Sequence, residues 1–266
     1  MIPNSVYQGD AKIILAMFPD ECIDLTVTSP PYDDLRTYNG YDFDFEAISM
    51  QLYRVTKPGG VVVWVVDDKS DEQGESGRSF EQALYLRSIG FRLHDTMIYM
   101  KSGPSYPSQD KYYQVFEYMF ILSKGIPKTV NLIKDRVNRW FGEKWSKVRT
   151  RRTKNGDLKS QIWYADEGEK LGVRFNIWEY AVGFGNHGDA FCHLHPASFP
   201  EELAHDHILS WSRPGDIVLD PLAGSGTTLK VAKELGRNYI GIEISQEYIE
   251  KIIMPRLKAA NVPLFV

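Results

Sequence analysis

The chain contains 266 residues, of which 43% are hydrophobic, 25% charged and 13% aromatic, a composition typical of a globular protein with a substantial core. Its apolar runs, such as residues 61–66, are far too short to span a bilayer, and its two cysteines, Cys22 and Cys192, cannot form a disulfide scaffold. Membrane, secreted and fibrous classes are therefore excluded. Since residues 1–10 show no signal-peptide pattern, we expect a cytoplasmic protein, and the net charge of −4 gives by itself no sign of a polyanionic partner.

Apolar runs alternate with helical patterns along most of the chain, which favours an α/β sheet over a helical bundle or a β-sandwich. Ser29-Pro30-Pro31 is expected to end the first strand, and residues 57–60, Lys-Pro-Gly-Gly, are expected to end the first helix. In chain order, the elements predicted before residue 125 are a strand at 24–28, a helix at 45–55, a strand at 61–66, a surface loop at 67–77, a helix at 80–88, and strands at 96–101 and 115–122.

The alternation of strands and helices stops after Gly125 and resumes at Pro200. The elements predicted beyond that point are a helix at 201–211, a turn at 213–216, a strand at 217–219, a helix at 227–235, a strand at 239–242 and a terminal helix from about Glu247. We therefore expect three parts: residues 1–125 and 191–266, which share one α/β domain, and an insert at residues 126–190.

Positive charge is concentrated in the insert. Residues 126–160 hold eleven Lys and Arg and three acidic residues, a net charge of +8, whereas the rest of the chain has a net charge of −12. Cations suit phosphates and flat rings can stack on bases, so this pattern predicts a nucleic-acid surface, with a solvated helical face as the plainer alternative. The aromatic residues within or after the basic run are Trp140, Phe141, Trp145, Trp163, Tyr164 and Trp178. The candidate DNA contacts are Lys147, Arg149, Arg151, Arg152 and Lys154.

A glycine-rich turn follows the predicted strand at 217–219. Gly224-Ser225-Gly226 opens the next helix, where backbone amides can approach a ligand closely. No Gly-Lys-Ser/Thr follows, as a nucleoside-triphosphate loop requires, and the third glycine of a dinucleotide fingerprint is missing. Glu243 ends the following strand, where a carboxylate can accept hydrogen bonds from both hydroxyls of a ribose. The combination predicts a site for a ligand that contains a ribose.

A second candidate site is the turn Thr28-Ser29-Pro30-Pro31-Tyr32, which offers the Ser29 hydroxyl, the Pro30 carbonyl and the Tyr32 ring. An exocyclic amine of a nucleobase is a poor nucleophile because its lone pair is delocalised into the ring. Two acceptors, one for each N–H, would localise that lone pair, while Tyr32 stacks on a base flipped out of the duplex. The prolines would keep the acceptors preorganised, although a Pro-Pro turn that only ends a strand is the simpler interpretation.

Ser29-Pro30-Pro31-Tyr32 and residues 220–228, Asp-Pro-Leu-Ala-Gly-Ser-Gly-Thr-Thr, resemble the two motifs of the amino-methylating DNA methyltransferases that use S-adenosyl-L-methionine. The order of catalytic motif, basic region and cofactor motif resembles the circularly permuted β class of that family. The similarity extends over everything except the insert, including residues 52–60 and 118–125. The resemblance implies a doubly wound, mostly parallel seven-stranded methyltransferase sheet with helices on both faces and an inserted target-recognition region.

The resemblance also implies roles for individual residues. The target amine and base would be held by Ser29, Pro30, Pro31 and Tyr32. The implied cofactor-binding residues are Asp10, Phe199, Asp220, Pro221, Ala223, Gly224, Gly226, Thr227 and Glu243. Within this set, Glu243 would bind the ribose, and Asp10 and Phe199 would hold the adenine. Asp220 would line the methionine end of the cofactor, together with Gly224 and Gly226. Taken alone, Asp10 could be a turn acid and Phe199 a core aromatic.

Other functional classes fit parts of the sequence. A non-catalytic DNA-binding module of the same fold would be favoured if the acceptor turn or Glu243 were lost, and both are present. A nucleotide-dependent oxidoreductase would be favoured by a complete three-glycine fingerprint, and the third glycine is absent here. Methylation of a cytosine carbon requires a cysteine nucleophile, which the corresponding families place after a proline, whereas Glu21 and Phe191 precede the two cysteines here.

The target base and the partners follow from the resemblance. With serine at position 29, the motif Ser-Pro-Pro-Tyr resembles that of the cytosine-N4 enzymes. Relatives that methylate adenine N6 more often carry Asp or Asn at this position. We therefore expect cytosine N4, with adenine N6 as the alternative. Double-stranded DNA is the expected partner and the nucleoid the expected location, while a cognate restriction endonuclease and a homodimer are left open.

A cluster of histidines raises the question of a metal site. Five of the six lie within 21 residues beside Cys192, at His187, His193, His195, His205 and His207. Their spacing fits no regular zinc pattern, since no Cys-x-x-Cys pair is present, and the segment from His195 to Pro200 resembles the part of the family that completes the cofactor pocket. No metal is expected.

Overall fold

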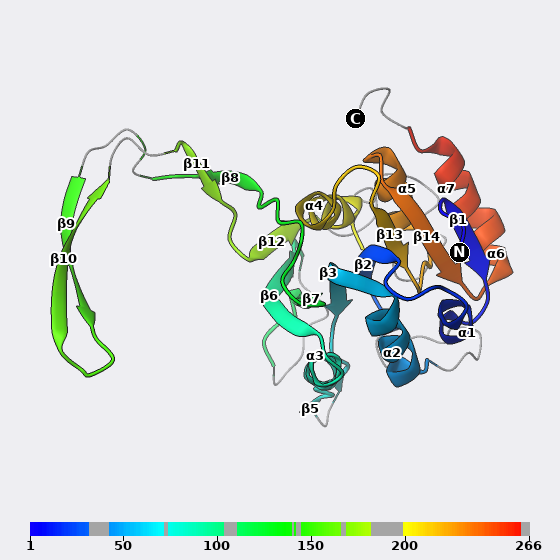
Figure 1. The fold of residues 1–266 in the computed structure, drawn as a ribbon, viewed down its shortest axis with the longest axis horizontal. Coiled ribbons are helices and arrows are strands. Elements are labelled where there is room, and N and C mark those ends of the chain that lie inside the picture. The colour runs from blue at the N-terminus through cyan, green and yellow to red at the C-terminus, as the bar shows by residue number, and fades with distance from the viewer. Residues whose placement is uncertain are drawn as a thin grey trace. The chain divides into compact units, whose positions relative to one another are not determined.

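The computed structural model describes residues 1–31, 43–71, 74–103, 111–139, 141, 145–165, 169–181 and 199–261 (Figure 1). The chain divides into two compact units. The larger unit comprises Met1–Asn131 and Asn176–Val266, and the smaller unit comprises Leu132–Phe175. Within the described ranges, no helix has the length and apolar character needed to cross a membrane.

A mixed sheet, with eight strands in the described residues, forms the centre of the larger unit. Its strands are, in spatial order, β1 (Ser5–Gln8), β14 (Asn238–Glu243), β13 (Ile217–Asp220), β2 (Ile23–Thr28), β3 (Thr56–Val66), β7 (Phe116–Ser123), β6 (Arg92–Lys101) and β12 (Ile177–Tyr180). Among these eight, β7 alone runs antiparallel to its neighbours, so the mostly parallel sheet is confirmed. The sheet has one strand more than the seven expected, because β12 pairs with β6 at its edge.

Helices cover both faces of this sheet, as the doubly wound fold requires (Figure 1). On one face, Leu15, Leu52 and Leu86 pack into a common core with Trp64 of β3. These leucines belong to α1 (Ala11–Ala16), α2 (Phe45–Val55) and α3 (Arg78–Ser88). The remaining helical elements are α4 (Glu201–Trp211), α5 (Thr227–Glu234), α6 (Gln246–Tyr248), the π-helical turn Ile249–Ile253 and α7 (Met254–Ala259).

The sequence signals at helix ends have clear structural counterparts. Asp44 caps α2, since its carboxylate accepts a hydrogen bond from the Ala47 N–H at 3.2 Å. The same helix buries Ile48, Leu52 and Val55 on one face, at the spacing of helical turns. The observed bounds of α2 and α4 match the predicted helices at 45–55 and 201–211.

Residues 57–60 end α2 as predicted but belong to a strand, since β3 begins at Thr56. The pairing of β3 with β2 is irregular here, because several residues of β3 lie opposite the short interval between Ile23 and Leu25. Such a bulge accommodates Pro58, which has no N–H to donate to a ladder. The local pattern therefore predicted the end of the helix correctly and missed the start of the strand.

Several short elements of the larger unit were not predicted. They are β1, α1, β12 and the hairpin of β4 (Ser70–Asp71) and β5 (Gly74–Glu75), which lies in the predicted loop at 67–77. β12 falls inside the segment 126–190 that was expected to be an insert, whereas the smaller unit ends at Phe175. The four residues of β12 alternate between exposed and buried, and Trp178 and Tyr180 are the buried ones. An alternation of four residues is too short to identify a strand from the sequence.

The smaller unit contains, in its described residues, two antiparallel strand pairs: β8 (Lys134–Val137) with β11 (Leu171–Val173), and β9 (Trp145–Arg152) with β10 (Leu158–Ala165). The turn between β9 and β10 is closed by the Thr153 N–H, which donates to the Asp157 carbonyl at 2.8 Å. Gly156 in this turn has a φ of +88°, which glycine adopts without strain. The second half of the basic run therefore lies in a β-hairpin formed by β9 and β10, and the helical face considered as an alternative is wrong.

Candidate active site

The carboxyl ends of five parallel strands, β1, β14, β13, β2 and β3, meet along one edge of the sheet. From β2 the chain passes through α2 to β3 on one side, and from β13 it passes through α5 to β14 on the other (Figure 1). The junction between β2 and β13 is therefore a topological switch point. Open α/β sheets bind ligands beyond the strand ends at such points.

The predicted catalytic turn follows β2 at this junction. Thr28, the last residue of β2, is buried, and its hydroxyl donates to Asp220 Oδ1 at 2.8 Å. Ser29 is half-buried and follows immediately, and the next two residues, Pro30 and Pro31, are buried and half-buried. Tyr32 lies outside the described residues. The Thr28–Asp220 hydrogen bond thus joins the start of the predicted catalytic turn to the first residue of the predicted cofactor segment.

Asp220 ends β13 and is buried. Its Oδ1 also accepts a hydrogen bond from the Leu222 N–H at 3.1 Å. Burial raises the pKa of Asp220 to about 6, although the hydrogen bonds from Thr28 and Leu222 favour the ionised form. A positively charged ligand beside this carboxyl would favour its ionised form and lower its pKa again.

We expect Asp220→Asn to change how stability depends on pH. Because the folded-state pKa lies above the ordinary value of 3.8, the folded chain binds this proton more tightly than the unfolded chain, and stability falls as pH rises through that interval. Asparagine keeps an acceptor for Thr28 and Leu222 but cannot ionise. Relative to the wild type, the variant should gain roughly 2–3 kcal/mol of unfolding free energy between pH 4 and pH 8. Denaturant titrations at both pH values measure this, and a pH-independent difference would contradict the raised pKa.

The glycine turn follows Asp220 directly and adopts a tight conformation. Gly224 and Gly226 have φ values of +51° and +73°, in the left-handed region that favours glycine. The Ala223 N–H donates to the Ile242 carbonyl at 2.9 Å, which ties the turn to β14. The other predicted residues of this turn, Pro221, Ala223 and Thr227, are buried. Backbone amides at the start of α5 are thereby brought to the carboxyl edge of the sheet.

Glu243 ends β14 beside this turn. Its Oε2 accepts a hydrogen bond from the Gly224 N–H at 2.8 Å, and its Oε1 accepts one from the Ser245 N–H at 2.9 Å. Burial raises the pKa of Glu243, although both of these hydrogen bonds favour the carboxylate. Each carboxylate oxygen has a further lone pair, so Glu243 keeps the capacity to accept hydrogen bonds from a ligand. The structure therefore brings three of the predicted cofactor-binding residues, Asp220, Gly224 and Glu243, to the same edge of the sheet.

Asp10 reaches the same edge from β1. The Gly9 N–H donates to the Glu243 carbonyl at 3.0 Å, so the residue before Asp10 is joined directly to the end of β14. Asp10 also caps α1 by accepting a hydrogen bond from the Lys12 N–H at 2.9 Å, so the turn-acid interpretation describes part of its role. Phe199 is half-buried and stands two residues before α4.

A charged cluster at the ends of β3 and β6 was missed by the sequence analysis. Lys101 Nζ lies 2.8 Å from Glu117 Oε1 and 3.2 Å from Asp67 Oδ2. Burial raises the pKa of Asp67, and in Lys101 the two carboxylates outweigh burial and raise the pKa of the ammonium. The signal was present, because Asp67 and Asp68 directly follow a buried strand, but residues 67–77 were interpreted as a surface loop.

The candidate DNA contacts occupy the β9–β10 hairpin of the smaller unit. Arg151 and Arg152 end β9 and Lys154 lies in the turn, and all three side chains are exposed. Because successive residues of a strand face opposite sides, Arg151 and Arg152 lie on opposite faces of the hairpin. Lys147 and Arg149 occupy the positions of β9 that alternate with Val148 and Thr150. Among the described cations, Arg151 and Arg152 therefore do not share a face.

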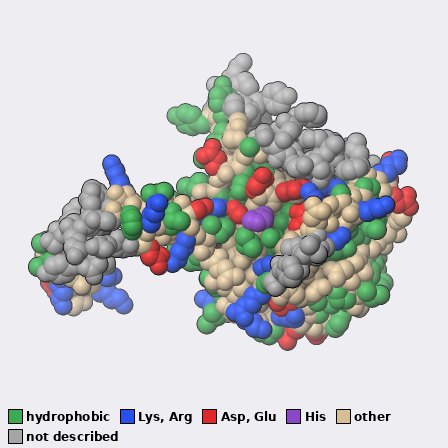
Figure 2. Space-filling model, turned by 90° about the horizontal axis from the view of Figure 1, so that it is seen from above, with side chains coloured by type: hydrophobic (Ala, Val, Ile, Leu, Met, Phe, Trp, Pro, Cys, Tyr) green, Lys and Arg blue, Asp and Glu red, His purple; other side chains and the backbone are tan. Residues whose placement is uncertain are grey.

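Apolar side chains share the hairpin with these cations. Val148, Leu158 and Ile162 are 60%, 64% and 53% exposed, and strand register puts them on the Arg152 face, since Leu158 pairs with Arg152 and Ile162 with Val148. Figure 2 shows hydrophobic and basic side chains together on the visible surface of the smaller unit. A surface of this composition suits a partner with both phosphates and apolar groups.

The histidine cluster is only partly described. His207 is buried against the Trp178 ring, at 4.6 Å between centroids, and burial lowers its pKa to about 3. Over the residues that the structure describes, no group of three or more His, Cys, Asp or Glu side chains could hold a metal ion. His187, Cys192, His193 and His195 lie outside those residues.

Comparisons with known proteins agree with this architecture. The model of the N6/N4 methyltransferase family, described as DNA methylase, matches residues 23–254. The orphan methyltransferase M.BamHII of Bacillus amyloliquefaciens is 55% identical over 240 residues, which are 90% of each chain. The DNA adenine methyltransferase YhdJ of Escherichia coli is 28% identical over 97% of this chain and 84% of its own.

Two solved structures share the fold. TTHA0409 of Thermus thermophilus, in complex with S-adenosyl-L-methionine, superposes with a TM-score of 0.65 at 24% identity, over 98% of this chain and 96% of its own. The PvuII DNA methyltransferase, described as cytosine-N4-specific, gives a TM-score of 0.67 at 20% identity, over 100% of this chain and 89% of its own. With the family model spanning both motifs, these findings establish that the chain belongs to the N6/N4 family of DNA methylases.

Proposed function

We propose that this protein transfers a methyl group from S-adenosyl-L-methionine to the exocyclic amine of a flipped base in duplex DNA, and that the target is cytosine N4. The observation that carries the proposal is the 2.8 Å hydrogen bond between Thr28 and Asp220. It holds the Ser29 turn, with its two acceptors, beside the glycine turn at the junction of β2 and β13. A methyl donor and an amine acceptor must meet at one place, and the two turns supply it.

The residues at the carboxyl edge fit this cofactor. Burial is the largest cause that raises the pKa values of both Asp220 and Glu243. The cofactor would bring a sulfonium and an ammonium group as cations, together with ribose hydroxyls as donors. Glu243 would accept from the hydroxyls, and Asp220 would favour the cationic methionine end. Asp10 and Phe199 would hold the adenine.

The chemistry of the Ser29 turn needs only hydrogen-bond acceptors. The Ser29 hydroxyl and the Pro30 carbonyl would each accept one N–H of the target amine, so that its lone pair is directed at the methyl group. The amine would attack the methyl carbon in one in-line step, so that the N–C bond forms as the C–S bond breaks and the sulfur leaves as a neutral thioether. The extra proton of the methylated amine would then pass to solvent. Tyr32 would stack on the base, which must leave the helix to reach the turn.

The choice of base depends on position 29. Serine and the acidic or amide side chains can all accept an N–H bond, so hydrogen bonding alone does not separate cytosine from adenine. The serine favours cytosine N4, because the motif Ser29-Pro30-Pro31-Tyr32 resembles the catalytic motif of the cytosine-N4 enzymes. Adenine N6 is the second candidate, because a relative of nearly full length is named as an adenine methyltransferase.

Sequencing that resolves modified bases tests base, product and recognition sequence together. DNA from cells that express the protein should carry N4-methylcytosine at one short motif, and DNA from cells that express the Ser29→Ala variant should carry far less of it at that motif. N6-methyladenine at such a motif would select the second candidate. Unmodified DNA from cells with folded, soluble protein would contradict the proposal. A DNA substrate would also locate the protein at the nucleoid.

Removing the ribose acceptor should weaken cofactor binding. We expect Glu243→Ala to lose about 1–3 kcal/mol of S-adenosyl-L-methionine affinity, because ribose hydroxyls lose a charged acceptor and Gly224 loses the partner of its N–H. Calorimetric titration measures the change, and Glu247→Ala, at an exposed glutamate of α6, is the matched control. Unchanged cofactor affinity, or tight binding of a nicotinamide dinucleotide, would refute the assigned role.

A further inference from the structure

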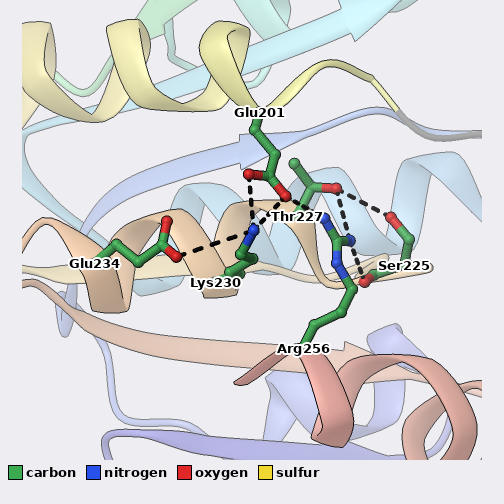
Figure 3. Close-up of polar contacts among 6 residues, drawn as sticks. All are labelled: Glu201, Ser225, Thr227, Lys230, Glu234 and Arg256. Carbon is green, nitrogen blue, oxygen red and sulfur yellow. Dashed lines mark hydrogen bonds and ion pairs between the residues drawn. The ribbon is translucent and has the colours of Figure 1, made fainter. Parts of the chain in front are cut away.

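A fully buried arginine lies beneath the glycine turn. Arg256 of α7 has a side chain with 0% exposure, and its Nη1 donates to the Ser225 carbonyl at 2.6 Å and to Thr227 Oγ1 at 3.0 Å (Figure 3). Its Nη2 donates to Glu201 Oε1 at 2.7 Å. One guanidinium therefore contacts the glycine turn, the first residue of α5 and the first residue of α4.

Glu201 extends this contact into a network. Its carboxylate also accepts from Lys230 Nζ of α5, at 2.7 Å and 2.8 Å to the two oxygens, and Lys230 lies 3.9 Å from Glu234 (Figure 3). Glu201 begins α4 and stands two residues after Phe199, the residue expected at the adenine. The network thus joins the two chain segments that hold opposite ends of the proposed cofactor, the glycine turn and the approach to α4.

The same terminal helix supports the glycine turn through an apolar contact. A Cβ on Gly226 would stand 3.0 Å from Ile253 Cγ2, so the turn and the π-helical stretch Ile249–Ile253 are in close contact. π-helical turns bring side chains out of the regular helical register and are frequent at functional sites. Ile253 packs against Gly226, and Arg256, three residues later, holds Ser225 and Thr227.

Burial of a guanidinium is costly, and well-packed apolar side chains often stabilise a core as well as a buried ion pair does. An arginine offers something that apolar side chains cannot, because its rigid fork of donors fixes several acceptors at defined positions. Here those acceptors belong to the turn whose backbone must present a ligand site. The arrangement therefore serves the geometry of the turn.

We propose that Arg256 is a positioning residue for the cofactor site, which keeps the turn 224–227 and the start of α4 in the conformation that binds S-adenosyl-L-methionine. This inference rests on the proposed function. It assigns to the terminal helix a role in cofactor affinity and none in the transfer step, since Arg256 acts through Ser225, Thr227 and Glu201.

The test separates cofactor binding from turnover in the full chain. Arg256→Met keeps the apolar stem and removes the donors, and we expect it to raise the dissociation constant for S-adenosyl-L-methionine by ~10-fold or more. At saturating cofactor its kcat should stay within about threefold of the wild type, because the acceptors of the Ser29 turn are untouched. Arg256→Lys should restore part of the affinity, since lysine keeps the charge but lacks the fork.

Lys251→Met is the matched control, because Lys251 lies in the preceding turn of the same helical segment and pairs with Glu247 at the surface. It should leave the cofactor dissociation constant unchanged. If Arg256→Met does not fold, the test uses Arg256→Lys and Glu201→Gln instead. The cofactor dissociation constant of each variant is then compared with that of the wild type. Unchanged cofactor affinity in folded variants, even with a lower Tm, would overturn the inference. Failure of the wild type itself to bind S-adenosyl-L-methionine would instead overturn the proposed function.

Discussion

Replacing Ser29 with alanine should lower the rate constant of methyl transfer by ~10²-fold or more, at saturating DNA and cofactor. The hydroxyl is one of two acceptors proposed for the target amine, and without it the lone pair of that amine stays delocalised in the transition state. Thr28, which bonds Asp220, is unchanged in this variant, so the two turns remain joined. Cofactor affinity should therefore change little, which distinguishes a loss in the chemical step from a loss of the site.

Single-turnover transfer of a labelled methyl group, together with calorimetric titration of the cofactor, measures both quantities. Ser88→Ala is a suitable control, because its exposed hydroxyl bonds only to the end of its own helix, at the Tyr85 carbonyl, among the contacts observed. Near-normal transfer by the Ser29 variant would remove Ser29 from the mechanism. A large loss of cofactor affinity would show instead that the substitution disturbs the junction of β2 and β13.

Direct transfer also predicts that no covalent intermediate forms between enzyme and base. Burial raises the pKa of the Cys22 thiol, so at neutral pH it stays protonated and is a poor nucleophile. Cys22 also precedes β2, at the opposite end of that strand from Ser29. A covalent adduct with a mechanism-based base analogue, trapped at Cys22 or Cys192, would contradict the mechanism.

The parts of the site that could be predicted from the sequence are those whose chemistry is local. Ser29-Pro30-Pro31 and Gly224-Ser225-Gly226 each combine turn-forming residues within three positions, and each comes shortly after a strand. In a parallel sheet the carboxyl ends of the strands lie along one edge, so two such turns are expected at the same edge. That β2 and β13 are neighbours within the sheet comes from the structure. Glu243 was predictable for the same reason, as an acid at the end of the next strand.

The residues that were missed depend on contacts between distant segments. Arg256 stands 55 positions after Glu201, and a basic residue in the last turn of a helix is ordinary in itself, so no local pattern distinguishes it. β12 has four residues, and its pairing with β6 joins segments separated by the whole smaller unit. The charge of the insert was evident from the sequence, but its strands were not predicted. Cations that alternate with apolar residues on a strand resemble a mixed helical face in composition, so the helical face could be considered as an alternative.

That strand geometry sharpens what the basic hairpin should do. Arg149 and Arg151 occupy alternate positions of β9, and Arg151 pairs with Lys159 of β10, whereas Arg152 lies on the other face with Val148, Leu158 and Ile162. If one face of the hairpin meets the DNA backbone, the arginines cannot all contribute. We expect the face of Arg151 to bind phosphates, because cations from both strands gather there.

Replacing Arg149 and Arg151 with glutamine should therefore weaken binding to cognate and unrelated duplexes alike. It should also reduce the slope of log affinity against log salt by roughly two units, one for each arginine that no longer neutralises a phosphate. Adding Arg152→Gln to give the triple variant should lower the slope no further. The cofactor site belongs to the larger unit, so S-adenosyl-L-methionine affinity should be the same in all of these variants. Fluorescence titrations of labelled duplexes across a salt series measure each slope.

The alternatives give different results in the same titrations. If one arginine reads a guanine edge, its replacement should cost about 1–3 kcal/mol on the cognate site and little on unrelated DNA. A slope that falls only when Arg152 is replaced would assign the DNA contact to the apolar face, where Val148 and Ile162 could contact sugars or base methyl groups. Unchanged slopes and affinities in every variant would mean that the hairpin is a solvated surface and that another part of the chain recognises the target.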